Sequence, residues 1–252
     1  MHRFYDSSPD VAAGRLRLSK PEAHHAVAVL RVREGDHVRV LDGRGGELIC
    51  RVESKGRREV SLQVLEEVRH SKPHGELVLI QSIVKGKAME LIVQKATELG
   101  ASRIIPLITE RTVARPDPSE FESKAEKWRG VAVEALKQCG APWLPLIDQP
   151  RELGNLLEGG LEWDLSLVAA LDDERCEARD RIESYVKEDN PFPRTVSIWI
   201  GPEGDFTPME LEEIQSAGVA PFGLGPLTLR SETASMAALA IVGAELRHLA
   251  NA

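Results

Sequence analysis

The sequence predicts an α/β protein whose larger part is a parallel sheet, preceded by a small all-β region. Two observations support this prediction. Between residues 38 and 64, apolar and polar residues alternate with a period of two, as in strands with one buried face. From residue 76 onward, continuous apolar runs typical of strands buried on both faces alternate with helical patterns. The stretch HSKPHG shows neither period, so we place a boundary there and expect domains at residues 1–70 and 74–252.

The first domain is predicted to be a small barrel or sandwich. A short helix is expected over residues 20–31, and three strands follow between residues 38 and 64. Asp42-Gly43 and Gly45-Gly46 are hairpin signals between the first two of these strands.

The second domain is predicted to contain four buried strands, at residues 76–83, 103–108, 165–171 and 195–201. The stretch KAMELIVQKATELG carries a helical apolar stripe, and a second helix is expected from Pro118 to about Cys139. Thr207, Pro208 and Glu210 form the pattern of a capping box with proline at the first helical position. The last helix is expected over about residues 233–250.

Composition and charge limit the classes of function. The 252 residues carry a net charge of −8, but residues 1–72 hold a surplus of three positive charges and residues 73–252 a surplus of eleven negative ones. A basic first domain is compatible with RNA held by one face, and equally with a solvated surface that has no partner. The apolar stretch at residues 236–244 has nine residues, whereas a membrane span needs about 20, so we expect no membrane association.

The three cysteines lie far apart and show no metal-ligand spacing, and no secretory signal begins the chain. We therefore expect a reduced, cytoplasmic protein without a bound metal.

Two glycine-rich loops are the strongest candidates for chemistry. Neither the phosphate loop GxxxxGK[ST] nor the fingerprint GxGxxG after a strand is present. Instead, IGPEGDF (200–206) follows a buried strand and precedes a capped helix, and LGPLTLRSET (224–233) precedes the last helix. Ligands of open α/β sheets bind just beyond the carboxyl ends of strands. Glycine and proline also suit any turn from strand to helix, so a purely structural role is the alternative for each loop.

The two loops resemble the closing motifs of the SPOUT methyltransferases. More narrowly, RFY near the start, HHAVAVLR, VKGKAMELIVQKATELGASRIIPLITER and KQCGAPWLP are similar to the 16S ribosomal RNA (uracil-N3) methyltransferase family, the RsmE type. The resemblance covers about residues 2–250. It implies a PUA-like β-barrel, then a trefoil-knotted parallel sheet with helices on both faces, S-adenosylmethionine as methyl donor, and a homodimer that acts on 16S ribosomal RNA, alone or within the small ribosomal subunit.

The sequence departs from the family pattern at three places. Lys137 stands where the family usually has glutamate, and Ala141 where it usually has arginine. Asp205 replaces a frequent second glycine, and Leu227 and Thr228 replace a frequent arginine. These changes affect the expected RNA contacts more than the expected cofactor pocket.

Roles for individual residues follow from the resemblance. The cofactor is expected to contact Leu171, Ile200, Gly201, Glu203, Gly204, Leu224, Gly225 and Leu229. Arg230 is the candidate that stabilises negative charge on the uracil oxygens, because its guanidinium is always charged and can form two parallel bonds. Glu232 is either the base that accepts the proton of N3 or a group that orients Arg230.

RNA is expected to contact Arg3, Phe4, Tyr5 and Arg31 through phosphate bonds and base stacking. For Phe4 and Tyr5, packing of an N-terminal strand is an equal alternative. The last helix is rich in small apolar residues and is expected to form a two-fold dimer interface. Two alternatives for the function remain: another RNA methylation, at a ribose 2′-hydroxyl or a different base, and a non-catalytic RNA-binding factor in ribosome assembly.

Overall fold

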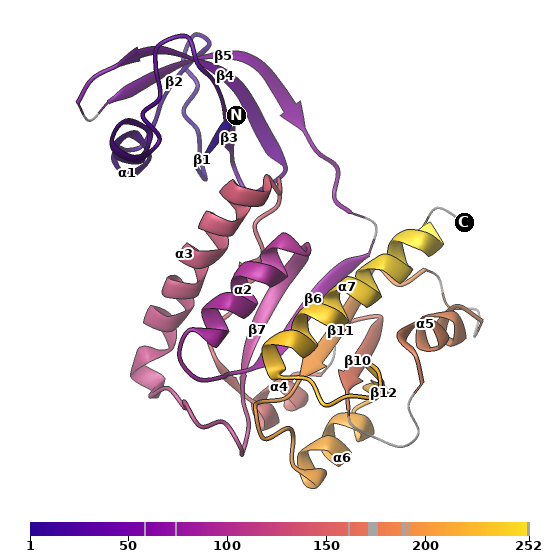
Figure 1. The fold of residues 1–252 in the computed structure, drawn as a ribbon. Coiled ribbons are helices and arrows are strands. Elements are labelled where there is room, and N and C mark those ends of the chain that lie inside the picture. Colours follow the sequence, from indigo (N-terminus) through magenta and orange to yellow (C-terminus); the bar gives the residue numbers. More distant parts are fainter. Residues whose placement is uncertain are drawn as a thin grey trace. The chain divides into compact units, whose positions relative to one another are not determined.

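The computed structural model describes residues 1–57, 59–73, 75–160, 162–170, 176–187, 190 and 192–250. The chain divides into two compact units (Figure 1). The first contains Met1–Lys72 together with Val133–Leu144, and the second contains Pro73–Ala132 and Pro145–Ala252. The sequence had placed residues 133–144 in the second domain, so this segment is the difference between the predicted and the observed division.

The first unit is built on one five-stranded sheet. Its strands are β1 (His2–Tyr5), β2 (Arg15–Arg17), β3 (His37–Leu41), β4 (Gly46–Lys55) and β5 (Val60–Arg69), in the order β1-β3-β4-β5-β2. Only the pair β1 and β3 is parallel. The helix expected at residues 20–31 is α1 (Lys20–His24), which continues as a π-helical turn, His25–Val29.

The core of the first unit follows the alternation seen in the sequence. Its buried residues include every second position of the central strands and the ring of Phe4; on the strands they are Val38, Val40, Leu48, Cys50, Val52, Val60 and Leu62. The period of two therefore predicted correctly which side of these strands is buried.

Residues 141–144 join the first unit through backbone hydrogen bonds to the turn between β3 and β4. The amide of Leu144 donates to the carbonyl of Gly43, and the amide of Gly45 donates to the carbonyl of Pro142, both at 2.9 Å. The indole of Trp143 occupies the space that a side chain at Gly45 would need. These contacts explain why the segment belongs to the first unit although it follows a helix that begins in the second.

The second unit contains a seven-stranded sheet in which all pairs are parallel. Its strands are β6 (Glu76–Ser82), β7 (Ala101–Ile108), β8 (Leu146–Ile147), β9 (Arg151–Glu152), β10 (Leu165–Ala169), β11 (Thr195–Ile200) and β12 (Ala220–Phe222). The order is β12-β10-β11-β6-β7-β8, and β9 also pairs with β7. The four predicted strands are the four longest, and β6 and β11 lie side by side at the centre.

Helices cover both faces of this sheet (Figure 1). They are α2 (Ala88–Glu98), α3 (Phe121–Cys139), α4 (Leu153–Glu158), α5 (Ala178–Lys187), α6 (Pro208–Ser216) and α7 (Ser231–Ala250). Val78 and Ile80 of β6 share a core with residues of α4 and α6. Leu77, which points to the opposite face, lies against Gly243 of α7.

The helix starts agree with the sequence in part. Thr207 and Glu210 form the expected capping box. At the short 3₁₀ turn Pro118–Glu120 before α3, Asp117 is the N-cap and forms a capping box with Glu120. Helix α7 begins at Ser231, two residues earlier than expected, so Ser231 and Glu232 lie in its first turn.

Within the described residues, the helices are too short or too polar for any of them to cross a membrane.

Candidate active site

A cavity of about 700 Å³ lies in the second unit, where several strands of the parallel sheet end. Its lining comes from the ends of β10 and β11, from the loops that follow β11 and β12, and from the first turns of α2 and α7. Ligands of parallel sheets bind at this edge, and cavities of roughly 300–1,000 Å³ hold small molecules and cofactors. The position and size of the cavity therefore suit a cofactor.

Ten residues were predicted to bind the cofactor or to act in catalysis, and nine of them line this one cavity. They are Ile200, Gly201, Glu203, Gly204, Leu224, Gly225, Leu229, Arg230 and Glu232. The tenth, Leu171, lies outside the described residues. The two glycine-rich loops, which are separate in the sequence, are thus brought together in space.

The sequence analysis did not assign roles to the other lining residues, which include Ala88, Ala169, Ala170, Asp205, Leu227 and Ser231. For the two alanines at positions 169 and 170, the signal was the end of a buried strand, where the sequence analysis chose the next residue, Leu171. Asp205 and Leu227 were noted only as departures from the family pattern.

The loop after β11 turns sharply and allows no side chain at its first residue. A Cβ atom on Gly201 would lie 2.6 Å from the Asp205 carboxylate and 3.1 Å from the Phe206 amide nitrogen. Asp205 has a φ of 59°, in the left-handed region that glycine adopts most easily. Its carboxylate accepts a hydrogen bond from the Phe206 amide at 2.8 Å. Gly201 is therefore required by the close approach within its own loop.

Two contacts hold the same loop from outside. The Glu203 carboxylate accepts a hydrogen bond of 3.0 Å from the amide of Lys85, which follows β6. The Arg111 guanidinium donates to the carbonyl of Gly204 at 2.6 Å. The loop is thus tied to the segments that follow β6 and β7. Glu203 uses its carboxylate in this tie, which is a role that the sequence did not suggest.

The second loop brings two charged side chains to the cavity at the start of α7. The Ser231 hydroxyl donates to the carbonyl of Gly201 at 2.7 Å and so joins the two loops directly. Within the described residues, neither Arg230 nor Glu232 makes a side-chain hydrogen bond or an ion pair. An ion pair of Arg230 with Glu232 or Glu203, the structural alternative for this arginine, is therefore not formed in this part of the chain.

The candidate RNA-binding residues lie in the first unit and have different surroundings. The ring of Phe4 is fully buried in the core of the sheet, so it cannot stack on a base, and the packing alternative is correct for this residue. Tyr5 is half-buried. Arg31 is exposed and has a left-handed φ of 54°, two residues after the end of the π-helical turn.

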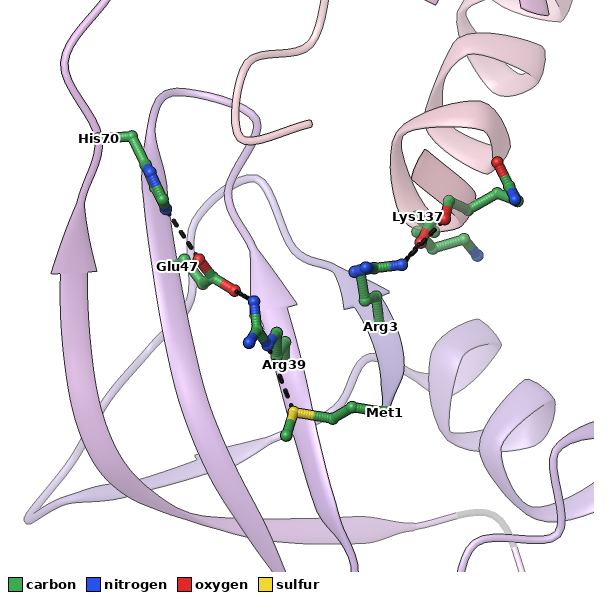
Figure 2. Close-up of polar contacts among 7 residues, drawn as sticks. Met1, Arg3, Arg39, Glu47, His70 and Lys137 are labelled. Carbon is green, nitrogen blue, oxygen red and sulfur yellow. Dashed lines mark hydrogen bonds and ion pairs between the residues drawn. The ribbon is translucent and has the colours of Figure 1, made fainter. Parts of the chain in front are cut away.

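Arg3 has a structural contact as well. Its guanidinium donates to the carbonyl oxygens of Lys137 and Gln138, at 3.3 and 2.9 Å, at the end of α3 (Figure 2). Carbonyl oxygens at a helix end lack partners within the helix, and a cationic donor suits them. Arg3 therefore holds residues 137 and 138 to β1.

A cluster of polar side chains on the same sheet was not predicted from the sequence. The Glu47 carboxylate, nearly buried, lies 2.8 Å from both Arg39 Nη1 and His70 Nε2 (Figure 2). A nearly buried carboxylate requires such partners. Arg39 thus forms an ion pair within the protein. The positive surplus of residues 1–72 therefore overstates the positive charge that can contact RNA.

Two family models match different parts of the chain. A model described as an RNA methyltransferase domain matches residues 70–243, and one described as an RNA methyltransferase PUA domain matches residues 18–65.

Individual relatives are similar over most of their length. Ribosomal RNA small subunit methyltransferase E of Bacillus subtilis is 32% identical over 224 residues, which cover 88% of this chain and 86% of that protein. The enzyme of the same name from Aquifex aeolicus is 30% identical and covers 96% and 99%. A methyltransferase of Legionella pneumophila, solved with the cofactor SAM bound, superposes with a TM-score of 0.84 at 29% identity and covers 96% of both chains. By its sequence and its fold, the chain belongs to the RNA methyltransferase family of the ribosomal RNA small subunit methyltransferase E type.

Proposed function

We propose that this protein transfers a methyl group from S-adenosylmethionine to N3 of a uridine in 16S ribosomal RNA. The observation that carries the proposal is the meeting of both glycine-rich loops at one cavity, in a chain that belongs to the RNA methyltransferase family. The charged side chains of Arg230 and Glu232 reach this cavity without partners among the described residues.

The lining suits the proposed cofactor. Ile200, Leu224 and Leu229 offer apolar surface to an adenine ring, and the glycines of the first loop let backbone groups approach a ligand closely. When bound, S-adenosylmethionine supplies a methyl group activated by a positively charged sulfur. Acidic residues outnumber basic ones in the lining, with Glu203, Asp205 and Glu232 against Arg230, and this balance favours a ligand that carries positive charge.

The remaining chemistry concerns the uracil. Neutral N3 carries a proton and is a poor nucleophile, so the proton has to leave as the new bond forms. We assign the stabilisation of the resulting negative charge on the uracil oxygens to Arg230. We assign acceptance of the proton to Glu232, which lines the same cavity from the first turn of α7.

We assign RNA binding to the first unit. In the first unit, exposed Arg31 and half-buried Tyr5 remain candidates, and Arg3 is a weaker one because its guanidinium already binds two carbonyl oxygens. The match of residues 18–65 to a PUA domain model supports a role of the first unit in binding RNA. The affinity of such binding falls as the salt concentration rises, because phosphate contacts release counterions.

We also propose that two copies of the chain form a dimer through α7. Helices α2 and α7 lie side by side, and each exposes an apolar side chain: Leu91 is 38% and Ile241 is 40% exposed. Ala240 and Ala244 are exposed beside Ile241 on α7. An outer helix surface of small and apolar side chains allows close approach of a second helix.

The family resemblance further suggests that the chain is knotted and that it acts in the cytoplasm during ribosome formation. The knot is supported by the meeting of the two loops at one cavity and by the strand order, which places β11 beside β6 and β12 beside β10. Tracing the chain in an experimental structure tests it.

The function is tested by nucleoside mass spectrometry of 16S ribosomal RNA from a strain that lacks this gene. The proposal expects 3-methyluridine to disappear and to return with the wild-type gene. Loss of a 2′-O-methylated nucleoside or of another methylated base would show a different methyltransferase. An unchanged methylation pattern, together with no binding of S-adenosylmethionine in calorimetry, would favour a non-catalytic assembly factor.

A further inference from the structure

Three polar side chains are buried together, and one of them, Ser231, lines the cavity. Gln81, at the end of β6, is fully buried, and Ser231 and Ser235 of α7 are 6% and 1% exposed. Leu77 and Leu79 precede Gln81 on the same side of β6, and both are buried and apolar. A third leucine at position 81 would continue this pattern, so the glutamine is an exception that needs a reason.

The three side chains form one hydrogen-bond network. Gln81 Nε2 donates to the carbonyl of Ser82 and to Ser231 Oγ, both at 2.9 Å. Ser231 Oγ donates to the carbonyl of Gly201 at 2.7 Å. Ser235 Oγ binds Gln81 Oε1 and lies 2.7 Å from the carbonyl of Ser231. All polar atoms of the buried amide therefore have partners.

The amide also fixes the direction of the bond that joins the two loops. An amide nitrogen can only donate, so Ser231 Oγ must accept from Gln81. The single proton of this hydroxyl is then directed to the carbonyl of Gly201. Gln81 thus sets the orientation of the contact between the first cofactor loop and the first turn of α7.

The two charged residues to which roles in the reaction are assigned adjoin Ser231. Ser231 lies between Arg230 and Glu232 in the chain, and the Arg230 carbonyl accepts the first helical hydrogen bond, from the Ala234 amide at 2.8 Å. A buried network that is fully satisfied favours one arrangement over its alternatives. A network that anchors Ser231 therefore also limits where its two neighbours can lie.

We propose that Gln81 is a positioning residue of the methyl-transfer reaction, which anchors the first turn of α7 to Gly201 and thereby holds Arg230 in the cavity. The inference rests on the proposed function, because it acts through the role assigned to Arg230. Gln81 itself does not line the cavity and is not expected to touch substrate or cofactor.

Two variants and a matched control test the proposal in the full-length protein. Gln81→Met keeps the approximate length of the side chain and removes all of its hydrogen bonds. Gln81→Glu keeps the shape of the side chain but replaces the amide donor with a carboxylate oxygen, which accepts. Ser197→Ala is the control, because Ser197 is fully buried in the same sheet and loses bonds to Ser166 and Trp199, away from the cavity lining.

The first measurement is the single-turnover rate of methyl transfer to 16S ribosomal RNA at saturating S-adenosylmethionine. Misplacement of a reacting group by about 1 Å can cost on the order of 10²-fold in rate. We expect both Gln81 variants to lose about tenfold to a hundredfold in single-turnover rate. Ser197→Ala should lose a similar amount of thermal stability but keep the wild-type rate. In an Arg230→Ala background, Gln81→Met should cause no further loss, since it acts through Arg230.

The second measurement does not depend on activity. Amide hydrogen exchange of Ala234 should quicken at least tenfold in Gln81→Met and stay near the wild-type value in Ser197→Ala. An unchanged rate in both Gln81 variants, unchanged exchange, or a full additive loss in the Arg230→Ala background would each overturn the proposal. A wild-type protein that binds S-adenosylmethionine but leaves 16S ribosomal RNA unmethylated would overturn the proposed function instead.

Discussion

The ammonium group of Lys137 lies 2.9 Å from the carboxylate of Glu22, and both side chains are nearly buried although 115 positions separate them. Burial alone would lower the pKa of Lys137, but hydrogen bonds to Glu134 and Glu22 outweigh it and raise the pKa. Lys137 therefore stays charged at neutral pH. Its contact with Glu22 joins α1 to the end of α3.

Lys137→Met is expected to destabilise the protein by about 3 kcal/mol, because it leaves the Glu22 carboxylate nearly buried without its cation. The other oxygen of Glu22 already has no partner among the described residues. Adding Glu22→Gln should restore part of the loss, since the unpaired charge is then gone. Urea unfolding measures the free energy of unfolding of the single and the double variant. The control is Lys187→Met, which breaks an exposed pair with Glu183 and should cost under about 0.5 kcal/mol.

The thiols of Cys50 and Cys139 are expected to differ in reactivity. Burial in the sheet core raises the pKa of Cys50 to about 11, whereas Cys139 is exposed. At pH 8, an alkylating reagent should modify Cys139 rapidly and Cys50 only after unfolding, because the thiolate is the reactive form. Mass spectrometry of peptides after timed labelling would show this order, and rapid labelling of Cys50 would contradict it.

The same shift makes stability depend on pH in the alkaline range. The fold holds the Cys50 thiol neutral, with a pKa above the ordinary value of 9.0. Its contribution to stability is complete below pH 9 and is lost as the pH rises toward 11. The difference in unfolding free energy between the wild type and Cys50→Ala should therefore shrink over this interval. A constant difference would show that the buried thiol does not titrate as described.

Much of the site could be predicted because it follows from local patterns. Continuous apolar runs identified β6 and β11, and a loop after such a strand lies at the edge of the sheet where ligands bind. Both loops carry glycine and proline, and the Thr207 capping box gave the next helix start. Because the strands are parallel, their carboxyl ends lie at one edge of the sheet, and the two loops meet there to form the cavity.

Contacts between residues that are far apart in the sequence could not be predicted from it. Gln81 at the end of an apolar run looks like any polar residue at the end of a strand, and Ser231 is 150 positions away. Strands β8 and β9 have two residues each, too few for a period to show. The ring of Phe4 fits both stacking and packing by pattern, and only the paired sheet decides between them.

The exposed surface of α7 gives a prediction on assembly. Ile241→Glu should convert the proposed dimer into a monomer, because a charge at the centre of an apolar interface would be buried without a partner. Sedimentation velocity at micromolar concentration measures this change. Met209→Glu is the control, since Met209 of α6 is 71% exposed and lies on a different helix. A wild type that sediments as a monomer would contradict the proposed interface.

Gly201→Ala is expected to weaken binding of S-adenosylmethionine at least tenfold. The new Cβ would lie 2.6 Å from the Asp205 carboxylate and 3.1 Å from a backbone nitrogen, so the loop would have to shift. Adding Asp205→Gly should recover part of the affinity, because it removes the nearest obstacle and suits the φ of 59°. Calorimetry measures each affinity. Gly130→Ala in α3 is the control, because a Cβ there would meet nothing within 4 Å and Gly130 does not line the cavity.

Arg230→Ala is expected to slow methyl transfer by on the order of 10²–10³, the usual cost of removing one donor that stabilises developing negative charge. Arg230 directly precedes α7, where the positive end of the helix dipole adds to its own charge. Uracil N3 attacks only as its anion forms, so a fixed cation acts on the transition state more than on the ground state. Arg230→Lys should restore only part of the rate, because an ammonium group cannot form the planar pair of bonds.

The alternative for Arg230 is that it shapes the cofactor pocket, and the two roles predict different measurements. A catalytic Arg230 leaves the affinity for S-adenosylmethionine within about threefold in the alanine variant, while the single-turnover rate falls by the factor given above. A residue that only shapes the pocket would lower affinity and rate together, and saturating cofactor would then restore most of the rate. The absence of an ion pair to Glu203 or Glu232 among the described residues favours the first outcome, because no partner is lost with the guanidinium. Near-normal single-turnover methylation by Arg230→Ala would refute the catalytic role.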